Sequence, residues 1–424
     1  MADVVIKGGT VVSDVGVRRA DVAIQGQIVV AVGDDLTGDL VLDAGGCVVG
    51  PGLVDLHTHL RQPGREEAET VESGSRSAAL GGYTALVAMP DTQPVMDNAA
   101  VVREVQHLAH SGLCDVEVAG AITVGRDGTR LAPMGEMAAL GVRLFTDDGR
   151  GVQDERLMRR ALDYASGLGV TLAQNPDNEA MSRGGHMNEG PMSSELGIPG
   201  IPAEAEELMV IRDVTLSRLT GGRVHFQTLT TAGSVGIVRA AKASGLPITA
   251  EAAPHHWCLT DAAVATYDPN FKVDPPLRQA HDVEALRSGI REGVIDAIAT
   301  DHSPQEIHLK ELPFDEAPPG VVGLETAAAA AITELDLGVE ELFAALSTRP
   351  AQIAGIDESH GGPVLVGRSA NLAVIDPNAT WVVDGAAMAS RSSNTAFHGR
   401  TLKGRVRHTL HAGDPVVIDG EAQR

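Results

Sequence analysis

Eight short apolar runs, each followed by a loop and most of them then by a helical pattern, limit most strongly what this chain can fold into. They are 53–59, 83–89, 116–122, 142–146, 170–174, 224–228, 248–252 and 297–301. The stretch 154–165 is typical of the segments between them, with apolar residues at helical spacing. Eight alternating strand and helix units predict a (β/α)₈ TIM barrel. A doubly wound sheet is the competing topology, but no Gly-x-Gly-x-x-Gly follows the first run.

The two ends of the chain have a different pattern from the middle. Short alternating runs with turn residues between them occur at 4–9, 21–27, 28–32 and 41–46, and again at 370–377, 381–384 and 406–413. We therefore expect residues 1–50 and 363–424 to form one composite small β-sandwich domain. The barrel is expected to occupy 51–362.

Composition excludes several classes of partner. The chain has 424 residues, 43% of them hydrophobic, and a formal net charge of −24, which argues against binding to nucleic acid or to an anionic membrane. It has no apolar run of 18 residues and does not open with a signal-peptide pattern. Its three cysteines are far apart, so neither disulfides nor a thiolate zinc site is indicated. The expected location is the cytoplasm.

Polar residues that could carry chemistry gather where the predicted strands end. In a (β/α)₈ barrel the catalytic residues lie at the C-terminal ends of strands, at one mouth. His57 and His59 end the first run, and alternate residues of a strand face the same way, as two ligands of one metal would. The residues that follow later runs are Asp91, Asp147, Asp148, Asn175, Thr228, His255, His256, Asp301 and His302.

Six ordered motifs carry a family resemblance. They are 51–64, 88–95, 145–149, 249–256, 274–278 and 298–304. With these motifs the chain resembles class I dihydroorotase, in the amidohydrolase superfamily, over essentially its whole length. The resemblance implies hydrolysis of a ring amide C–N bond in pyrimidine biosynthesis, with a small cyclic amide as substrate.

The resemblance also implies site residues. His57, His59 and Asp301 would hold one zinc ion, and Asp148 would contact it and, in the family, bridge to a second. Asp301 would act first as general base and then as general acid. Arg61, with its planar fork of donors, would pair with a carboxylate of the substrate.

The second-metal positions of this chain differ from the family pattern. Where the family has two further metal-ligating histidines, this chain has Asn175 and Thr228, which are poor zinc ligands. We therefore expect at most one metal ion per chain. Zinc is expected from the resemblance, although a His₂Asp₂ set would also accept Mn²⁺, Fe²⁺ or Co²⁺.

The positions implied to bind substrate differ as well; they are Arg61, Asp91, Asp274, Gln305, Pro319 and Gly320. Two of them are carboxylates where the family has asparagine, and Gln305 stands where it has histidine. An Asp91 near Arg61 would occupy the guanidinium and repel an incoming carboxylate. These substitutions argue against dihydroorotate as the substrate.

Simpler structural roles compete with some of these assignments. Asp91 and Asp274 could pair with neighbouring bases such as Arg61, Lys272 or Arg278 and close the pocket. His255 and His256 are expected to be structural, because adjacent histidines on a strand or turn point opposite ways. His225 is expected to face away from the mouth.

Two functions remain open on the sequence. The first is a mononuclear metal-dependent hydrolase that opens dihydroorotate at a reduced rate or a related ring with a less acidic tail. The second is an inactive homologue that serves as an assembly partner of aspartate transcarbamoylase, as noncatalytic members of the family do. In either case we expect a homo-oligomer.

Overall fold

All eight predicted runs contain strands, and these strands close into a barrel. In the computed structural model, which describes residues 2–424, they are β6 (Leu53–Thr58), β7 (Tyr83–Ala88), β8 (Asp115–Val118), β9 (Leu144–Phe145), β10 (Thr171–Gln174), β13 (Val224–Phe226), β14 (Ile248–Ala252) and β15 (Ala297–Ile298). Neighbours are parallel within the β6–β7–β8 and β9–β10–β13–β14–β15 groups. Bridges between Gly120 and Phe145 and between Thr58 and His302 join the groups. The prediction of a (β/α)₈ barrel is confirmed.

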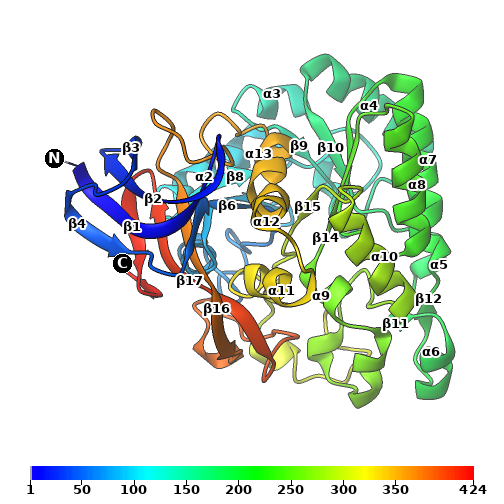
Figure 1. Ribbon diagram of the computed structural model, residues 1–424. Helices are drawn as coiled ribbons and strands as arrows, with labels where there is room; N and C mark the ends of the chain where they lie inside the picture. The colour runs from blue at the N-terminus through cyan, green and yellow to red at the C-terminus, as the bar shows by residue number, and fades with distance from the viewer. Residues whose placement is uncertain (1) are drawn as a thin grey trace.

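Helices surround this barrel (Figure 1). They are α1 (Val71–Leu80), α2 (Ala99–Ala109), α3 (Met134–Ala138), α4 (Glu155–Leu168), α5 (Glu179–Ser182), α6 (Pro191–Leu196), α7 (Glu204–Thr220), α8 (Ala232–Ala243), α9 (Pro254–Cys258), α10 (Ala280–Arg291), α11 (Ala327–Glu334), α12 (Val339–Phe343) and α13 (Arg349–Ala354).

Helix α4 shows how the sequence determines one of these elements. Asp154 caps its N-terminus by accepting a hydrogen bond from the Leu157 amide at 2.6 Å. Gly169 ends it in the left-handed conformation that glycine adopts without strain. Its apolar face includes Met158 and belongs to the same buried cluster as Leu172 of β10. The helix is therefore held by burial against the strand that follows it.

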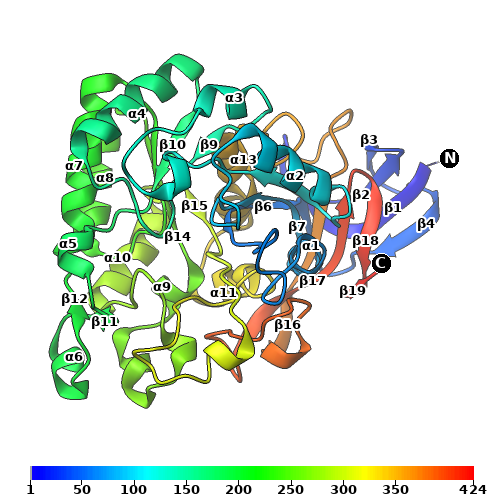
Figure 2. The same ribbon diagram turned by 180° about the vertical axis from the view of Figure 1, so that it is seen from behind.

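Both chain ends enter one nine-stranded sheet beside the barrel, and both termini lie at that end of the molecule (Figures 1 and 2). Its strands are β1 (Ala2–Ser13), β2 (Gly16–Gln25), β3 (Ile28–Gly33), β4 (Gly38–Asp43), β5 (Val48–Pro51), β16 (Leu372–Val382), β17 (Thr401–His411), β18 (Asp414–Ile418) and β19 (Glu421–Ala422). Strand β16 pairs antiparallel with β5 and thereby joins the two ends. Ile6 and Val374 share one buried cluster. The boundaries at 50/51 and 362/363 stay a prediction.

Two details differ from the sequence prediction. The run at 381–384 is not a separate strand, because β16 continues across an irregularity between Asp376 and Thr380 and ends at Val382. Between β10 and α7 the chain also makes an excursion with two short paired strands, β11 (Met187–Asn188) and β12 (Gly200–Ile201). No helix within 2–424 is both long and apolar enough to span a membrane.

Candidate metal centre and substrate pocket

Two histidines and two aspartates converge at the mouth of the barrel. The Nε2 atom of His57 lies 3.2 Å from Oδ1 of Asp148, and Nε2 of His59 lies 3.4 Å from Oδ2 of the same carboxylate. Oδ1 of Asp301 lies 3.7 Å from each of these Nε2 atoms. His57, His59 and Asp148 can each offer a ligand atom within 4.8 Å of the others. These four residues are the ones that the resemblance assigns to the metal.

The donor set fits a divalent metal ion. Nε2 of His57 is buried and has no hydrogen-bond partner among residues 2–424, although it faces two carboxylates. Burial alone would lower the pKa of His57, but Asp148, Glu251 and Asp301 raise it well above its usual value. The site therefore attracts positive charge to this nitrogen, and imidazole and carboxylate together are ligands that zinc and similar ions prefer.

A buried carboxylate orients His57 from behind. Oε1 of Glu251 lies 2.8 Å from Nδ1 of His57, and its Oε2 lies 2.9 Å from Nε2 of His225. Burial would raise the pKa of Glu251, but hydrogen bonds and charge from both histidines lower it. An ionised Glu251 that accepts the Nδ1 proton leaves Nε2 of His57 free for a metal, as in carboxylate–histidine–zinc triads. His225, which was expected to face away from the mouth, is thus connected to the cluster.

The two substituted second-metal positions contact the first cluster instead. The side-chain amide of Asn175 donates to Oδ1 of Asp148 at 3.3 Å, and the hydroxyl of Thr228 lies 3.2 Å from Nδ1 of His57. Burial would raise the pKa of Asp148, but His57, His59 and Arg126 lower it to about 2. Asn175 and Thr228 therefore support the first set of ligands.

Three non-glycine residues within three positions of the end of a barrel strand have left-handed backbone. The φ angles are +58° at Arg61, +45° at Thr228 and +48° at Asp301. Such residues cost on the order of 1–3 kcal/mol each and persist where the surrounding structure holds them. Their presence at the ends of β6, β13 and β15 indicates that the mouth is built for a function.

Each of the three nitrogens of the Arg61 guanidinium has a protein partner. It pairs with Asp91 through Nη1, donates to the Ser303 hydroxyl at 2.7 Å through Nη2, and donates to the Pro304 carbonyl at 3.2 Å through Nε. The other oxygen of Asp91 lies 3.0 Å from Nδ1 of His59. Burial would raise the pKa of Asp91, but His59 and Arg61 hold it far below the usual range. The expected ion pair of Asp91 with Arg61 is present.

Asp274 behaves differently from Asp91. Among residues 2–424 no lysine, arginine or histidine side chain comes within ion-pairing distance of it, so the pairing with Lys272 or Arg278, one of the two alternatives left open by the sequence, does not form. Lys272 donates instead to the carbonyls of Phe314 and Asp315. Although Asp274 is exposed where it lines the pocket, the protein around its carboxylate and the nearby charges of other aspartates raise its pKa to about 7.

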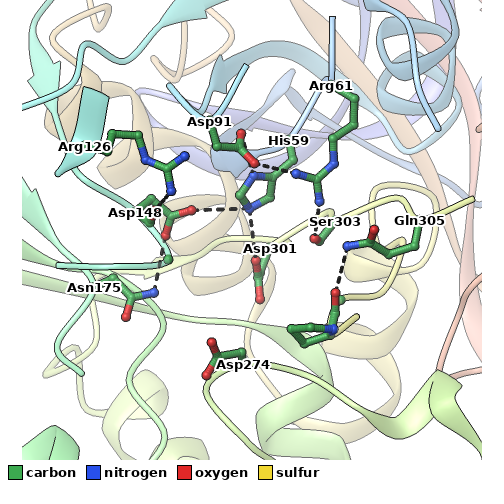
Figure 3. A pocket seen from close by; sticks show the side chains of 13 residues that line it. His59, Arg61, Asp91, Arg126, Asp148, Asn175, Asp274, Asp301, Ser303 and Gln305 are labelled. Carbon is green, nitrogen blue, oxygen red and sulfur yellow. Dashed lines mark hydrogen bonds and ion pairs between the residues drawn. The ribbon is translucent and has the colours of Figure 1, made fainter. Parts of the chain in front are cut away.

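A cavity of about 200 Å³ opens in front of these residues. Figure 3 shows His59 near its centre, Arg61 and Asp91 together, and Asp274 apart from them. Gln305 is also engaged, because it donates to the Pro319 carbonyl at 2.8 Å and accepts from Arg65 at 3.1 Å. The other lining residues are Arg126, Asp148, Gly149, Asn175, Asp301, Ser303, Pro319 and Gly320.

Several residues of the site were missed or misplaced by the sequence analysis. Glu251 and Arg126 were not singled out, although a carboxylate inside the apolar run 248–252 is a signal for a buried polar contact. Residues 255 and 256 lie on α9, and there Nε2 of His255 reaches within 3.5 Å of Oδ2 of Asp301. Nε2 of His256 instead lies 2.7 Å from the Pro275 carbonyl. Only the first of the two therefore reaches the cluster.

Comparison with known proteins places the chain in a family. The family model described as dihydro-orotase-like matches residues 46–234. A dihydroorotase of Streptomyces coelicolor is 46% identical over 99% of this chain and 100% of its own length, and one of Mycobacterium bovis is 46% identical over 95% and 96%. The chain belongs to the dihydroorotase family. It is therefore a member of the amidohydrolase superfamily and a hydrolase of cyclic amides.

Solved structures of other proteins share the fold. An L-hydantoinase from Arthrobacter aurescens superposes with a TM-score of 0.90 over 100% of this chain and 98% of its own, at 24% identity. A dihydropyrimidinase from Brevibacillus agri gives a TM-score of 0.85 over 99% and 96%, at 22% identity. At these identities the likeness concerns the barrel and its accompanying β-domain, and the chemistry must be argued from the residues of this chain.

Proposed function

We propose that this chain hydrolyses a ring amide at a single divalent metal site formed by His57, His59, Asp148 and Asp301. The convergence of both histidine Nε2 atoms on two carboxylates carries the proposal. A bound divalent ion would supply Lewis-acid activation of water and of the ring carbonyl. Zinc is the ion we propose, because the donors are nitrogen and oxygen in a compact set.

Asp301 carries the proton in this proposal. Burial would raise the pKa of its carboxyl, but the neighbouring imidazoles of His255, His59 and His57 lower it well below its usual value. The carboxylate is thus ionised at neutral pH and can accept the proton of the attacking water. As the new C–O bond forms and the ring C–N bond breaks, Asp301 returns that proton to the leaving nitrogen.

The residues around the metal ligands fix the geometry of the reaction. Glu251 holds His57 through its Nδ1, and Asp91 lies beside Nδ1 of His59. Asn175 holds Asp148. Three of the four ligands therefore have a neighbour outside the metal set, and preorganised ligands of this kind raise both affinity and rate.

The relatives named dihydroorotase support dihydroorotate as one substrate. The Arg61–Asp91 pair argues for a reduced rate on that acidic ring, or for a related ring with a less acidic tail. The alternative function, an inactive assembly partner of aspartate transcarbamoylase, rests on the substitutions at Asn175 and Thr228. The complete first cluster argues against it.

Turnover assays with purified chain test the proposal. After removal of metal and addition of one equivalent of Zn²⁺, Mn²⁺ or Co²⁺, we expect hydrolysis of dihydroorotate, dihydrouracil or hydantoin, and loss of it in His59→Ala. No turnover of any of these rings with any metal, together with co-elution with a transcarbamoylase on sizing, would favour the assembly role instead.

A further inference from the structure

Arg126 is a cation beside the metal cluster that no carboxylate of residues 2–424 neutralises. It lines the same cavity as Arg61 and Asp91. Arg61 is paired with Asp91, whereas no acidic side chain in the described part of the chain comes within ion-pairing distance of Arg126. Figure 3 shows Arg126 next to Asp148 on one side of His59, and Arg61 on the other side. The charge of Arg126 is therefore available in the cavity.

Two of the three nitrogens of the Arg126 guanidinium lack an acceptor. Its Nη2 group donates to the backbone carbonyl of Asp148. Its Nε is buried without a hydrogen-bond partner, and its Nη1 donates to no residue within 2–424. Buried donors are almost always paired in native proteins, so an unpaired one at a cavity indicates an acceptor that the protein itself does not supply. A carboxylate fits this role, because its two oxygens match two N–H groups of the planar guanidinium.

The loop that carries Arg126 is held in place on both sides of this residue. Before it, the amide of Thr123 donates to Oδ1 of Asp147 at 3.0 Å. After it, the amide of Gly128 donates to the Thr123 hydroxyl at 3.0 Å. Arg126 itself has left-handed backbone, with a φ angle of +53°, which non-glycine residues adopt only at a cost. The surrounding contacts therefore fix where the guanidinium can lie.

The charges that line the cavity leave Arg126 without a counterpart. A divalent ion would match the two aspartates of the proposed metal site, and the Arg61–Asp91 pair is neutral by itself. Asp274 is the one further acidic lining residue within 2–424, and it lies across the cavity from Arg126 (Figure 3). A substrate that brings one negative charge to the Arg126 side of the cavity is therefore matched there.

Resting on the proposed function, we infer that the substrate is a cyclic amide with a ring carboxylate, and that Arg126 rather than Arg61 receives this carboxylate. On a six-membered ring the carboxylate lies only a few bonds from the scissile amide. A cation beside the main chain of Asp148 is therefore within reach of a ring bound at the metal. Arg126 is then a specificity-determining residue, and it takes over the role from which Asp91 withdraws Arg61.

Two rings that differ only in one charge, dihydroorotate and its primary amide, test this inference on the metal-loaded enzyme. We expect kcat/KM for the acid to exceed that for the amide by about tenfold, the factor that one charge-assisted hydrogen bond supplies. In Arg126→Gln this ratio should fall toward one, through a higher KM for the acid. Arg130→Gln removes the same charge from an exposed residue of the same loop outside the cavity, and it should keep the wild-type ratio.

The outcomes separate this inference from the proposed function. An unchanged ratio in Arg126→Gln would overturn the inference and leave the hydrolase standing. An equal loss on both rings, with less zinc bound per chain, would show that Arg126 only positions Asp148, and would overturn the inference as well. Failure of the wild type to hydrolyse either ring would instead refute the hydrolase itself.

Chemical labelling of the wild type gives a second readout that needs no variant. Phenylglyoxal modifies arginine side chains, and peptide mass spectrometry locates the modified residue. Orotate, which carries the same ring carboxylate, should slow the modification of Arg126, whereas uracil, which lacks it, should not. Equal rates of modification with the two rings at saturation would overturn the inference, even if Arg126→Gln does not fold.

Discussion

At the scale of single residues, the site is defined by which polar atoms already have hydrogen-bond or ion-pair partners within the protein. Arg61 is the residue that the family resemblance assigns to a substrate carboxylate, yet in this chain Asp91 occupies it. A charge-assisted pair of this kind is strong when it is buried, and both side chains are nearly inaccessible to solvent. The identity of residue 91 therefore controls what Arg61 can bind.

Changing Asp91 to Asn should free Arg61 for an acidic ring. The amide oxygen can still accept from Nδ1 of His59, whereas the negative charge that competes with the substrate is gone. We expect kcat/KM for dihydroorotate to rise about tenfold, as expected for one charge pair gained. Steady-state kinetics measure this. An unchanged or lower value would show that Asp91 does not block the guanidinium.

Changing Glu251 to Gln should weaken the metal site without removing a ligand. Without the carboxylate behind His57, nothing holds the Nδ1 proton in place. Partners of this kind raise metal affinity by about 10–100-fold. Competition with a fluorescent chelator gives the affinity, and circular dichroism shows whether the fold is kept. Wild-type affinity in a folded Glu251→Gln would refute the orienting role.

The residues at the strand ends could be predicted from sequence because parallel strands bring their C-terminal ends to one mouth. Glu251 and Arg126 could not, since their roles depend on contacts between strands or loops far apart in the chain. The free state of Asp274 was also beyond prediction. Lys272 and Arg278 lie near it in sequence, but the fold directs both toward other acceptors.

At the scale of elements, the loops of the mouth are tied together by a buried contact between a carboxylate and a histidine. Glu69, just before α1, lies 3.2 Å from Nε2 of His302, which follows β15. It also accepts hydrogen bonds from Ser390 and from the Arg391 amide at 3.3 Å. Neither member of the pair is exposed to solvent. One side chain thus connects three segments that are far apart in sequence.

Changing Glu69 to Gln should destabilise the protein by about 2–4 kcal/mol at pH 7, the range for breaking a buried, hydrogen-bonded pair. Burial would raise the pKa of Glu69, but His302, Ser390 and Ser73 lower it. A lowered folded-state pKa contributes stability above the unfolded value of about 4.3, and this stability is lost as pH falls through the folded pKa.

Urea unfolding at a series of pH values measures this effect. The difference between wild type and Glu69→Gln should be full at pH 7 and shrink below about pH 4, where the wild-type carboxyl takes up its proton. A difference that stays constant down to acid pH would show that the charge of Glu69 is not what stabilises these loops.

The order and type of the elements could largely be predicted from the hydrophobic pattern. Every apolar run of the barrel contains a strand, because burial against helices on one side and the barrel interior on the other requires such runs. The excursion containing β11 and β12 was not predicted, since its strands are two residues each and too short for a periodic signal. Pro254 at the first turn of α9 was an available helix-start signal that went unused.

At the scale of the whole molecule, the mouth depends on nearly the full length of the chain. Its metal ligands come from β6 and from the loops after β6, β9 and β15. Asn394, near the C-terminal strands, donates to the carbonyls of Ser303 and Gly320 at 3.1 and 2.9 Å. The two chain ends meet in one sheet. Segments from both ends of the barrel sequence and from the C-terminal region therefore meet at the mouth.

The proposed hydrolysis requires one metal ion per chain. The first ligand set is complete, whereas Asn175 and Thr228, at the positions implied for a second metal, contact Asp148 and His57 instead. Placing histidine at both positions should create a second site, and His59→Ala should remove the first. The double histidine variant, the wild type and His59→Ala should therefore hold two, one and no metal ions per chain, respectively.

The most direct test is the metal content of purified chain after equilibration with excess Zn²⁺ and removal of loosely bound ions, measured by mass spectrometry with an inductively coupled plasma. We expect one zinc per chain in the wild type, two in Asn175→His/Thr228→His and about none in His59→Ala. Two tightly held ions in the wild type, with hydrolysis of dihydroorotate as fast as in the double variant, would contradict the single-metal site.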